Sequence, residues 1–227
     1  MRFKHSTLYW YFKRKLRKYN IRKGGYGQYG QDIVVAGLLE NRDHGVFVDI
    51  GANDGVSLSN TLYFEEKGWR GVCVEPHPII FKELAKRRSC HTINACISDQ
   101  NTEVTFLAVD GPSHMLSGIT EFIDKRHSER IEKEIAINGG SKREIAIQAL
   151  TPRYLLEQYK IDKIDFLSID TEGCELEILK NFDFDSTSVE CISVENGSRS
   201  SQIFKHLVST GFSIVCCVGC DEIYLKR

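Results

Sequence analysis

The stretch VFVDIGANDGVSLSNT, residues 46–61, decides how the rest of the chain is interpreted. It starts as an apolar run typical of a buried strand, breaks at Asp49 and enters a turn that contains Gly51 and Gly55. Open α/β sheets bind their ligands at such strand ends. Gly51 would let a ligand approach the backbone, and the helix expected from residue 57 would offer N–H groups. The pattern G-x-N-x-G lacks the glycines of a dinucleotide fingerprint, and the acid before it disfavours a pyrophosphate and suits a cation.

The second apolar run ends in VCVEPHP, which places Glu75 24 residues after Gly51. In dinucleotide-binding folds a carboxylate at this place accepts the hydroxyls of a ribose. The two strand ends together favour a nucleoside that carries a positive charge and no phosphate, and S-adenosylmethionine has these properties. The alternative is that Glu75 is a surface residue at the end of a strand.

Apolar runs alternate with helical patterns along the chain, which is typical of βαβ units and a mostly parallel sheet with helices on both faces. The last two runs follow each other without a helix, so the sheet should finish with an antiparallel strand. Strands are predicted near residues 46–50, 71–75, 91–97, 103–109, 144–149, 164–169, 189–194, 212–217 and 222–226. Helices are predicted near residues 57–67, 78–88, 151–159, 173–180 and 199–210, with Gly68, Pro78 and Thr151-Pro152 as boundary signals.

The composition fits one globular domain, since 227 residues with 41% apolar and 27% charged side chains can form a single core. Residues 110–143 do not fit the alternation, and we expect an insertion over the site with a charged helix in its middle. No apolar run reaches the ~20 residues of a membrane span, and no signal-peptide core follows the N-terminal charges. We therefore expect a cytoplasmic protein with reduced cysteines, and the CCVGC cluster at 216–220 has no second pair for zinc.

The net charge of −1 hides an uneven distribution, because residues 1–23 carry nine Lys or Arg and no acid. A helix starting after Ser6 would place apolar side chains on one face, so residues 1–26 form a predicted basic amphipathic segment ahead of the domain at 27–227. This segment is expected to make peripheral contact with an anionic membrane or a polyanion. The alternative is a helix packed on the body. The apolar face would consist of Leu8, Phe12, Leu16 and Tyr19.

Four motifs resemble those of the FkbM family of S-adenosylmethionine-dependent methyltransferases. They are GQYGQD at 27–32, FVDIGANDG at 47–55, GWRGVCVEPHP at 68–78 and IDFLSIDTEGCELEILKN at 164–181. The resemblance runs from about residue 27 to the C-terminus and excludes much of 110–143. It implies a Rossmann-like class I methyltransferase fold with a seven-stranded sheet, and O-methylation, often of a sugar hydroxyl in a glycan or natural product. The cofactor site that it implies consists of Asp49, Gly51, Asn53 and Glu75, to which we add Pro76 and Asn94.

Two further predicted strands end in polar side chains, Asp170 on the first and Glu195-Asn196 on the second. If the strands are neighbours, these three residues converge and could hold Mg²⁺ or Mn²⁺ beside the methyl group. The competing hypothesis is metal-free catalysis by Asp170, or by His114 in the insertion, because a sugar hydroxyl needs a base.

The structural alternatives for these residues are simpler. Asp170 would cap the helix expected from Gly173, and Glu172 is expected to do no more than that. Glu195 is a further candidate catalytic residue, and His77 and His127 are weaker candidates for the base.

Three other functions are weighed against the methyltransferase. An oxidoreductase is disfavoured by the turn at 49–55. A nucleic-acid N-methyltransferase is disfavoured because Asp170-Thr171-Glu172-Gly173 replaces the tetrapeptide [N/D]-P-P-[Y/F] expected for amino groups. A non-catalytic, membrane-docked binding module remains as the third alternative, and turnover of the cofactor with glycan acceptors would separate it from the enzymes.

Overall fold

The computed structural model describes residues 24–227, and the predicted basic amphipathic helix at 1–23 lies outside them. The first described residues pack on the body of the protein. The backbone N–H of Tyr26 donates to Asp32 over 2.5 Å, and its hydroxyl donates to Glu66 over 2.7 Å. Contact with the body therefore begins before residue 27.

Seven strands form the main sheet in the order β10-β11-β9-β8-β1-β2-β3. Their bounds are β1 Val46–Ile50, β2 Arg70–Val74, β3 His91–Ile93, β8 Lys163–Ile169, β9 Ser188–Glu195, β10 Phe212–Val218 and β11 Asp221–Lys226. Neighbours from β3 to β9 pair in parallel, whereas β11 is antiparallel to both β9 and β10. The predicted Rossmann-like sheet is thus confirmed. The order reverses between β1 and β8, so the edge at their carboxyl ends is the expected ligand-binding edge.

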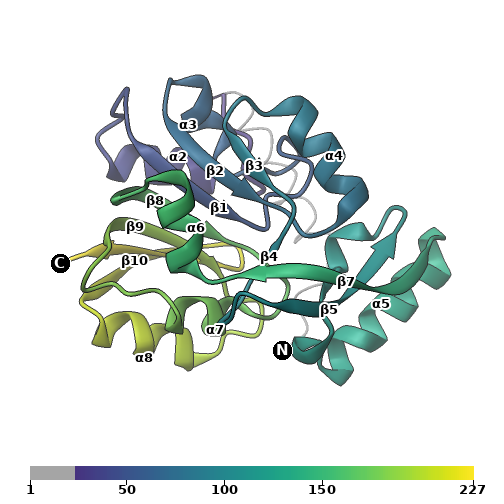
Figure 1. The fold of residues 1–227 in the computed structure, drawn as a ribbon. Helices are drawn as coiled ribbons and strands as arrows, with labels where there is room; N and C mark the ends of the chain where they lie inside the picture. Colours follow the sequence, from purple (N-terminus) through teal and green to yellow (C-terminus); the bar gives the residue numbers. More distant parts are fainter. Residues whose placement is uncertain (1–23) are drawn as a thin grey trace, which may run out of the picture.

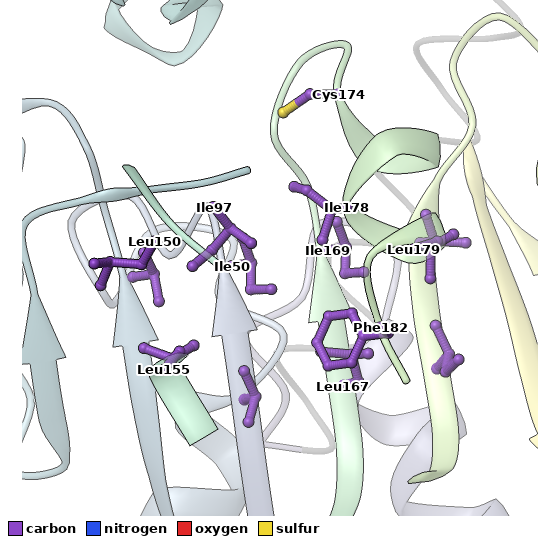
Figure 2. Packing of buried hydrophobic residues seen from close by; sticks show 14 of the residues in the cluster. Ile50, Ile97, Leu150, Leu155, Leu167, Ile169, Cys174, Ile178, Leu179 and Phe182 are labelled. Carbon is purple, nitrogen blue, oxygen red and sulfur yellow. The ribbon is translucent and has the colours of Figure 1, made fainter. Parts of the chain in front are cut away.

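Helices cover both faces of this sheet (Figure 1). One layer contains α2 Gln31–Leu38, α3 Leu62–Glu66 and α4 Pro78–Arg87, and the other contains α6 Pro152–Tyr159, α7 Glu175–Lys180 and α8 Ser201–Ser209. Successive side chains of β1 point to opposite layers. Phe47 packs in the hydrophobic cluster with α2, α3 and α4, whereas Val48 and Ile50 pack in the cluster with α6, α7 and α8. Figure 2 shows Ile50 and Ile169 of the sheet beside Ile178 of α7. Burial of each such side chain contributes about 1.5–3 kcal/mol.

The boundary signals at Gly68, Pro78 and Thr151-Pro152 are confirmed. Gly68 follows α3 with φ of 89°, Pro78 opens α4, and Thr151 accepts the N–H of Tyr154 over 3.2 Å at the start of α6. The predicted start of α3 is wrong.

That helix begins at Leu62 and not near residue 57. Asp54 accepts the N–H groups of Val56 and Ser57, and Ser59 Oγ accepts that of Leu62. Side chains that bond nearby backbone groups compete with helix formation, so residues 51–61 form a loop.

A second sheet, which the sequence pattern did not predict, has the order β4-β7-β5-β6. Its strands are β4 Cys96–Ile97, β5 Glu103–Asp110, β6 Gly118–Ile119 and β7 Ser141–Leu150. The predicted strand at 91–97 therefore splits between two sheets. Its break coincides with Asn94, whose amide donates to the carbonyls of Glu75 and Pro76 over 2.8 and 2.9 Å.

The predicted insertion joins β5 to β7 and contains η1 His114–Leu116, β6, η2 Thr120–Phe122 and the charged helix α5 Lys125–Asn138. Helix α5 docks through Ile131, which is buried against Val109 and Leu116. Figure 1 shows β5, β7 and α5 projecting to one side of the main sheet. Within residues 24–227, no helix is both long and apolar enough to cross a bilayer.

Candidate active site at the carboxyl ends of the strands

An open cavity of about 1160 Å³ lies at the carboxyl ends of β1, β2, β8 and β9, beneath the insertion. It is large enough for a nucleoside and a second small molecule, since drug-sized pockets measure ≈ 300–1,000 Å³. Every predicted site residue except Asn94 lines it. These residues are Asp49, Gly51, Asn53, Glu75, Pro76, His114, Asp170, Glu195 and Asn196. Asn94 instead braces the end of β2 through its two carbonyl contacts.

The turn after β1 is held so tightly that only glycine fits at position 51. Gly51 has φ of 88°, and a Cβ there would lie 1.8 Å from the carbonyl oxygen of Asp170. The N–H groups of Gly51 and Ala52 both donate to the carbonyl of Val74 over 3.0 Å. Because the turn uses these N–H groups internally, it does not offer them to a phosphate, and the expected helix N-terminus begins only at Leu62.

Glu75 follows β2 directly and contacts two other segments of the cavity wall. Its carboxylate accepts the N–H of Asn53 over 2.9 Å and that of His77 over 2.8 Å, one on each oxygen. The residue is 8% exposed, and burial raises its pKa to about 7. Each carboxylate oxygen has a second lone pair, so Glu75 can still accept two hydroxyl groups from a ligand.

Asp49 holds the loop at 51–61 in place. Its carboxylate is 4% exposed and accepts the hydroxyl of Thr61 over 2.6 Å, and burial raises its pKa. Thr61 in turn accepts a hydrogen bond from Arg88 over 3.1 Å, and Arg88 also donates to the Gly55 carbonyl and forms a 2.5 Å ion pair with Glu65. Sequence reasoning missed Arg88, because nothing in the run KRRS marks one arginine as buried.

Asn60 is a second residue that the sequence did not single out. Its amide nitrogen donates to Ser168 Oγ over 3.2 Å, whereas its oxygen is buried without a hydrogen-bond partner in the described part of the chain. Asn60 also lines the cavity. A buried acceptor without a partner is costly, so a ligand that donates an N–H or O–H here would be favoured.

Carboxylates gather where β8 and β9 end. Asp170 opens into the cavity, and desolvation by the surrounding protein and the charges of Glu195 and Asp221 hold its pKa well above the ordinary value. Burial and the charge of Glu195 raise the pKa of Glu172 to about 7, against the opposing effect of Arg130. This cluster makes the end of the cavity a favourable place for a cation and gives Asp170 the character of a stronger base.

The predicted capping role of Asp170 or Glu172 is wrong. Helix α7 begins at Glu175, and the carboxylate of Glu175 itself accepts the N–H groups of Thr171 and Gly173 over 3.0 and 2.9 Å. These two N–H groups therefore donate to Glu175 and not to Asp170 or Glu172.

The predicted metal site at Asp170, Glu195 and Asn196 is not supported. In residues 24–227, no group of three or more His, Cys, Asp or Glu side chains could hold a metal ion. Asn196 is 3% exposed and already engaged, because its oxygen accepts the N–H of Ser200 over 2.8 Å and its nitrogen donates to Ser200 and Glu222. The oxygen donors therefore do not fit Mg²⁺ or Mn²⁺.

His114 connects the insertion to the turn after β1. Its Nδ1 lies 3.1 Å from the Gly111 carbonyl oxygen and its Nε2 lies 3.0 Å from the Asn53 side chain. His114 thus reaches the cavity, although both ring nitrogens are engaged.

The two weaker candidates for the base hold other parts of the wall. His77 is 2% exposed, caps α4 by accepting the N–H of Ile79, and contacts the Val109 carbonyl over 3.2 Å. His127 contacts the Leu116 carbonyl over 2.8 Å. Burial lowers the pKa of His77, which keeps that ring neutral in its structural role.

Two solved methyltransferase structures are similar to this chain. Among solved structures, this chain is similar to a methyltransferase from Geobacter sulfurreducens, with 11% identity, 94% of this chain and 87% of that chain covered, and a TM-score of 0.43. It is also similar to a TehB-like SAM-dependent methyltransferase from Corynebacterium glutamicum, with 10% identity, coverage of 94% and 96%, and a TM-score of 0.38. No curated protein sequence matches it.

A family model also matches the sequence of this chain. The methyltransferase FkbM domain matches residues 49–213, which include the turn after β1, the end of β2 and the carboxylates after β8 and β9. This match extends over most of the 227 residues. The chain therefore belongs to the FkbM methyltransferase family.

Proposed function

We propose that the protein is an S-adenosylmethionine-dependent O-methyltransferase that methylates a sugar hydroxyl of a glycan or glycoconjugate. One observation carries the proposal. Glu75 faces the cavity as an acceptor, while the N–H groups of the adjoining turn are bound to Val74. This combination suits a ribose without a phosphate.

The remaining donors and acceptors of the cavity fit that cofactor. Glu75 would accept the ribose hydroxyls, and the unpartnered oxygen of Asn60 would accept an N–H of the cofactor. The close approach of Gly51 to the Asp170 carbonyl leaves no side chain between the two strand ends. When bound, S-adenosylmethionine supplies an activated methyl group, and the carboxylates around Asp170 favour its positive sulfur.

Asp170 is the proposed base for the acceptor hydroxyl. A sugar hydroxyl is a poor nucleophile near neutral pH, so its proton must pass to a positioned group as the methyl group is transferred. Asp170 lines the cavity, and its raised pKa makes the ionised carboxylate a better proton acceptor. His114 is the second candidate, since it lines the same cavity.

Oxygen is favoured over nitrogen as the methyl acceptor because of the segment that follows β8. Asp170-Thr171-Glu172-Gly173 supplies acids where an amino-group methyltransferase would use an amide and two prolines. A nucleic-acid acceptor is disfavoured for the same reason. A non-catalytic binding module would bind the cofactor without turning it over, so turnover of the cofactor with glycan acceptors separates it from the enzyme.

The proposal is tested by incubating the full chain with methyl-labelled S-adenosylmethionine and a panel of glycans. We expect label in a glycan product, and the label should survive alkali, because a methyl ether is stable whereas a methyl ester is hydrolysed. Label that is released by alkali, or that appears on amines, would refute O-methylation of a hydroxyl. Failure of S-adenosylhomocysteine to bind in calorimetry would refute the cofactor as well.

We propose further that residues 1–23 make peripheral contact with an anionic membrane, which would bring the enzyme close to membrane-linked glycoconjugates. The nine basic residues without an acid support this partner.

A further inference from the structure

We infer that Arg126 and Arg199 form a binding site for an oxyanion of the acceptor, so that the substrate is an acidic sugar bearing a carboxylate or a phosphate. This inference rests on the proposed function and specifies its substrate class. Both arginines line the cavity at positions outside the predicted site, Arg126 on α5 of the insertion and Arg199 on the loop between β9 and α8.

The two arginines differ from Arg130, the third arginine that lines the cavity, because neither is held in an ion pair within the part of the chain that the structure describes. Arg130 also lines the cavity, but it forms a 3.1 Å ion pair with Glu172. Asp124 precedes Arg126, but its carboxylate caps α5 by accepting the N–H of His127 over 2.7 Å. Neither Arg126 nor Arg199 forms an ion pair with any residue in the range 24–227.

The backbone at Arg199 is held in an unusual conformation. Its φ of 53° lies in the left-handed region that non-glycine residues rarely occupy. Asn196 stabilises this turn, because its carbonyl accepts the N–H of Arg199 over 2.9 Å and its side chain bonds both the N–H and the carbonyl of Ser200. Strained residues that are fixed in this way concentrate at functional sites. Asn196, predicted as a metal ligand, is thus a positioning residue for Arg199.

The charge distribution of the cavity separates two kinds of ligand. Asp170, Glu172 and Glu195 make the strand ends acidic, which suits the sulfonium of the cofactor and repels an anion. An anionic acceptor therefore needs positive groups elsewhere on the wall, and the insertion and the β9–α8 loop each supply one. Guanidinium groups bind carboxylate and phosphate through paired N–H donors, so arginine fits either oxyanion.

The experiment measures sugar binding to the full chain saturated with S-adenosylhomocysteine. The probes are methyl glucoside, methyl glucuronide and glucose 6-phosphate, which share a ring and differ in charge. We expect the neutral sugar to bind at least 10-fold more weakly than the better of the two anions, and the anion that binds identifies a carboxylate or a phosphate as the natural group. Arg126→Gln and Arg199→Gln should each weaken that binding by about 10- to 100-fold, as expected for a charge-assisted hydrogen bond.

A matched control is Arg70→Gln. Arg70 is an exposed arginine without an ion pair in the described residues, and it begins β2, so it lies at the opposite end of that strand from Glu75. This variant should leave binding of all three sugars unchanged. All three arginines are exposed, so thermal unfolding should be the same in each variant.

Several outcomes would overturn the inference. One is equal binding of the neutral and anionic sugars, and another is failure of both anions to bind. A third is that both glutamine variants bind the anion as the parent does. If the variants lose S-adenosylhomocysteine and not the sugar, the arginines bind the carboxylate of the cofactor instead. Transfer of a methyl group to a neutral glycan, with both variants fully active, would retain the proposed function and refute only this inference.

Discussion

The backbone N–H of Asn53 donates to the carboxylate of Glu75 over 2.9 Å, although the two residues lie 22 positions apart. This bond ties the turn after β1 to the end of β2. The side chain of Asn53 meets His114 over 3.0 Å, so the same residue also contacts the insertion. Asn53 therefore connects the end of β2 to the insertion through these two contacts.

Replacement of Glu75 should weaken cofactor binding without unfolding the protein. Glu75→Ala removes two charge-assisted acceptors for the ribose, a loss of about 2–4 kcal/mol. Calorimetry with S-adenosylhomocysteine measures this loss of binding free energy. Glu83→Ala is the control, because Glu83 is an exposed carboxylate of α4 paired with Lys86, and it should bind as the parent does. Equal affinity of Glu75→Ala and the parent would show that the ribose lies elsewhere.

The raised pKa of Glu75 should make stability depend on pH. In the folded protein its pKa is about 7, against 4.5 for an ordinary glutamate. The folded state therefore holds the proton more tightly, so this contribution is fully present below pH 4.5 and is lost as pH rises through about 7. Its full size is roughly 3 kcal/mol. Urea unfolding across this pH range should show that the free energy of unfolding falls less with rising pH in Glu75→Gln than in the parent.

The same carboxylate should couple cofactor binding to pH. Ribose hydroxyls donate to the ionised form, so affinity for S-adenosylhomocysteine should increase as pH rises to about 7 and then level off. Binding just below pH 7 should release protons, which calorimetry in buffers of different ionisation enthalpy detects. An affinity that is independent of pH would contradict this role of Glu75.

Asp170→Asn should reduce turnover far more than cofactor affinity. Removal of a general base costs about 10²- to 10⁴-fold in rate. Because Asp170 repels Glu195 and Asp221, the neutral side chain should also raise the melting temperature. His114→Asn is the comparison, since it preserves a polar side chain at the other candidate. A large rate loss in His114→Asn with an active Asp170→Asn would assign the base to His114.

Gly51→Ala should destabilise the protein and abolish cofactor binding. The added Cβ would lie 1.8 Å from the Asp170 carbonyl oxygen, and the left-handed conformation alone costs alanine about 1–2 kcal/mol. Gly37→Ala is the matched control. Gly37 lies exposed within α2 with no atom within 4 Å of the added Cβ, so alanine there should stabilise by about 0.5–1 kcal/mol. Melting curves distinguish the two, and a stable Gly51→Ala that binds cofactor would contradict the geometry.

Removal of residues 1–23 should separate membrane binding from cofactor binding. A protein that starts at Gly24 retains Tyr26 and its contacts with Asp32 and Glu66, so it should fold and bind S-adenosylhomocysteine. It should lose salt-sensitive binding to vesicles that contain phosphatidylserine, to which each basic residue contributes about 1 kcal/mol. Vesicles of phosphatidylcholine are the control. An unfolded truncation would instead support a segment packed on the body.

The local sequence pattern was sufficient for the main sheet and for the residues that line the cavity after β1 and β2. The informative residues lie next to the strands that they follow. They are Gly51 after the apolar run that contains Asp49, and Glu75 after the second apolar run. Strand periodicity and turn chemistry depend mostly on such near neighbours, so the strands and the polar residues at their ends could be predicted. The boundary signals at Gly68, Pro78 and Thr151 succeeded for the same reason.

The tertiary structure alone decided which polar side chains face the ligand and which hold the frame. Arg88 donates a hydrogen bond to Thr61, 27 positions away, and Asn94 donates to the carbonyls of the two residues that follow β2. The side chain of Asn196 accepts the N–H of Ser200 in the turn that contains Arg199. The second sheet likewise depends on β5 pairing with β7 across the insertion. A side chain's role in these cases depends on which distant backbone groups would otherwise be buried without a hydrogen bond, and those groups meet only when the chain has folded.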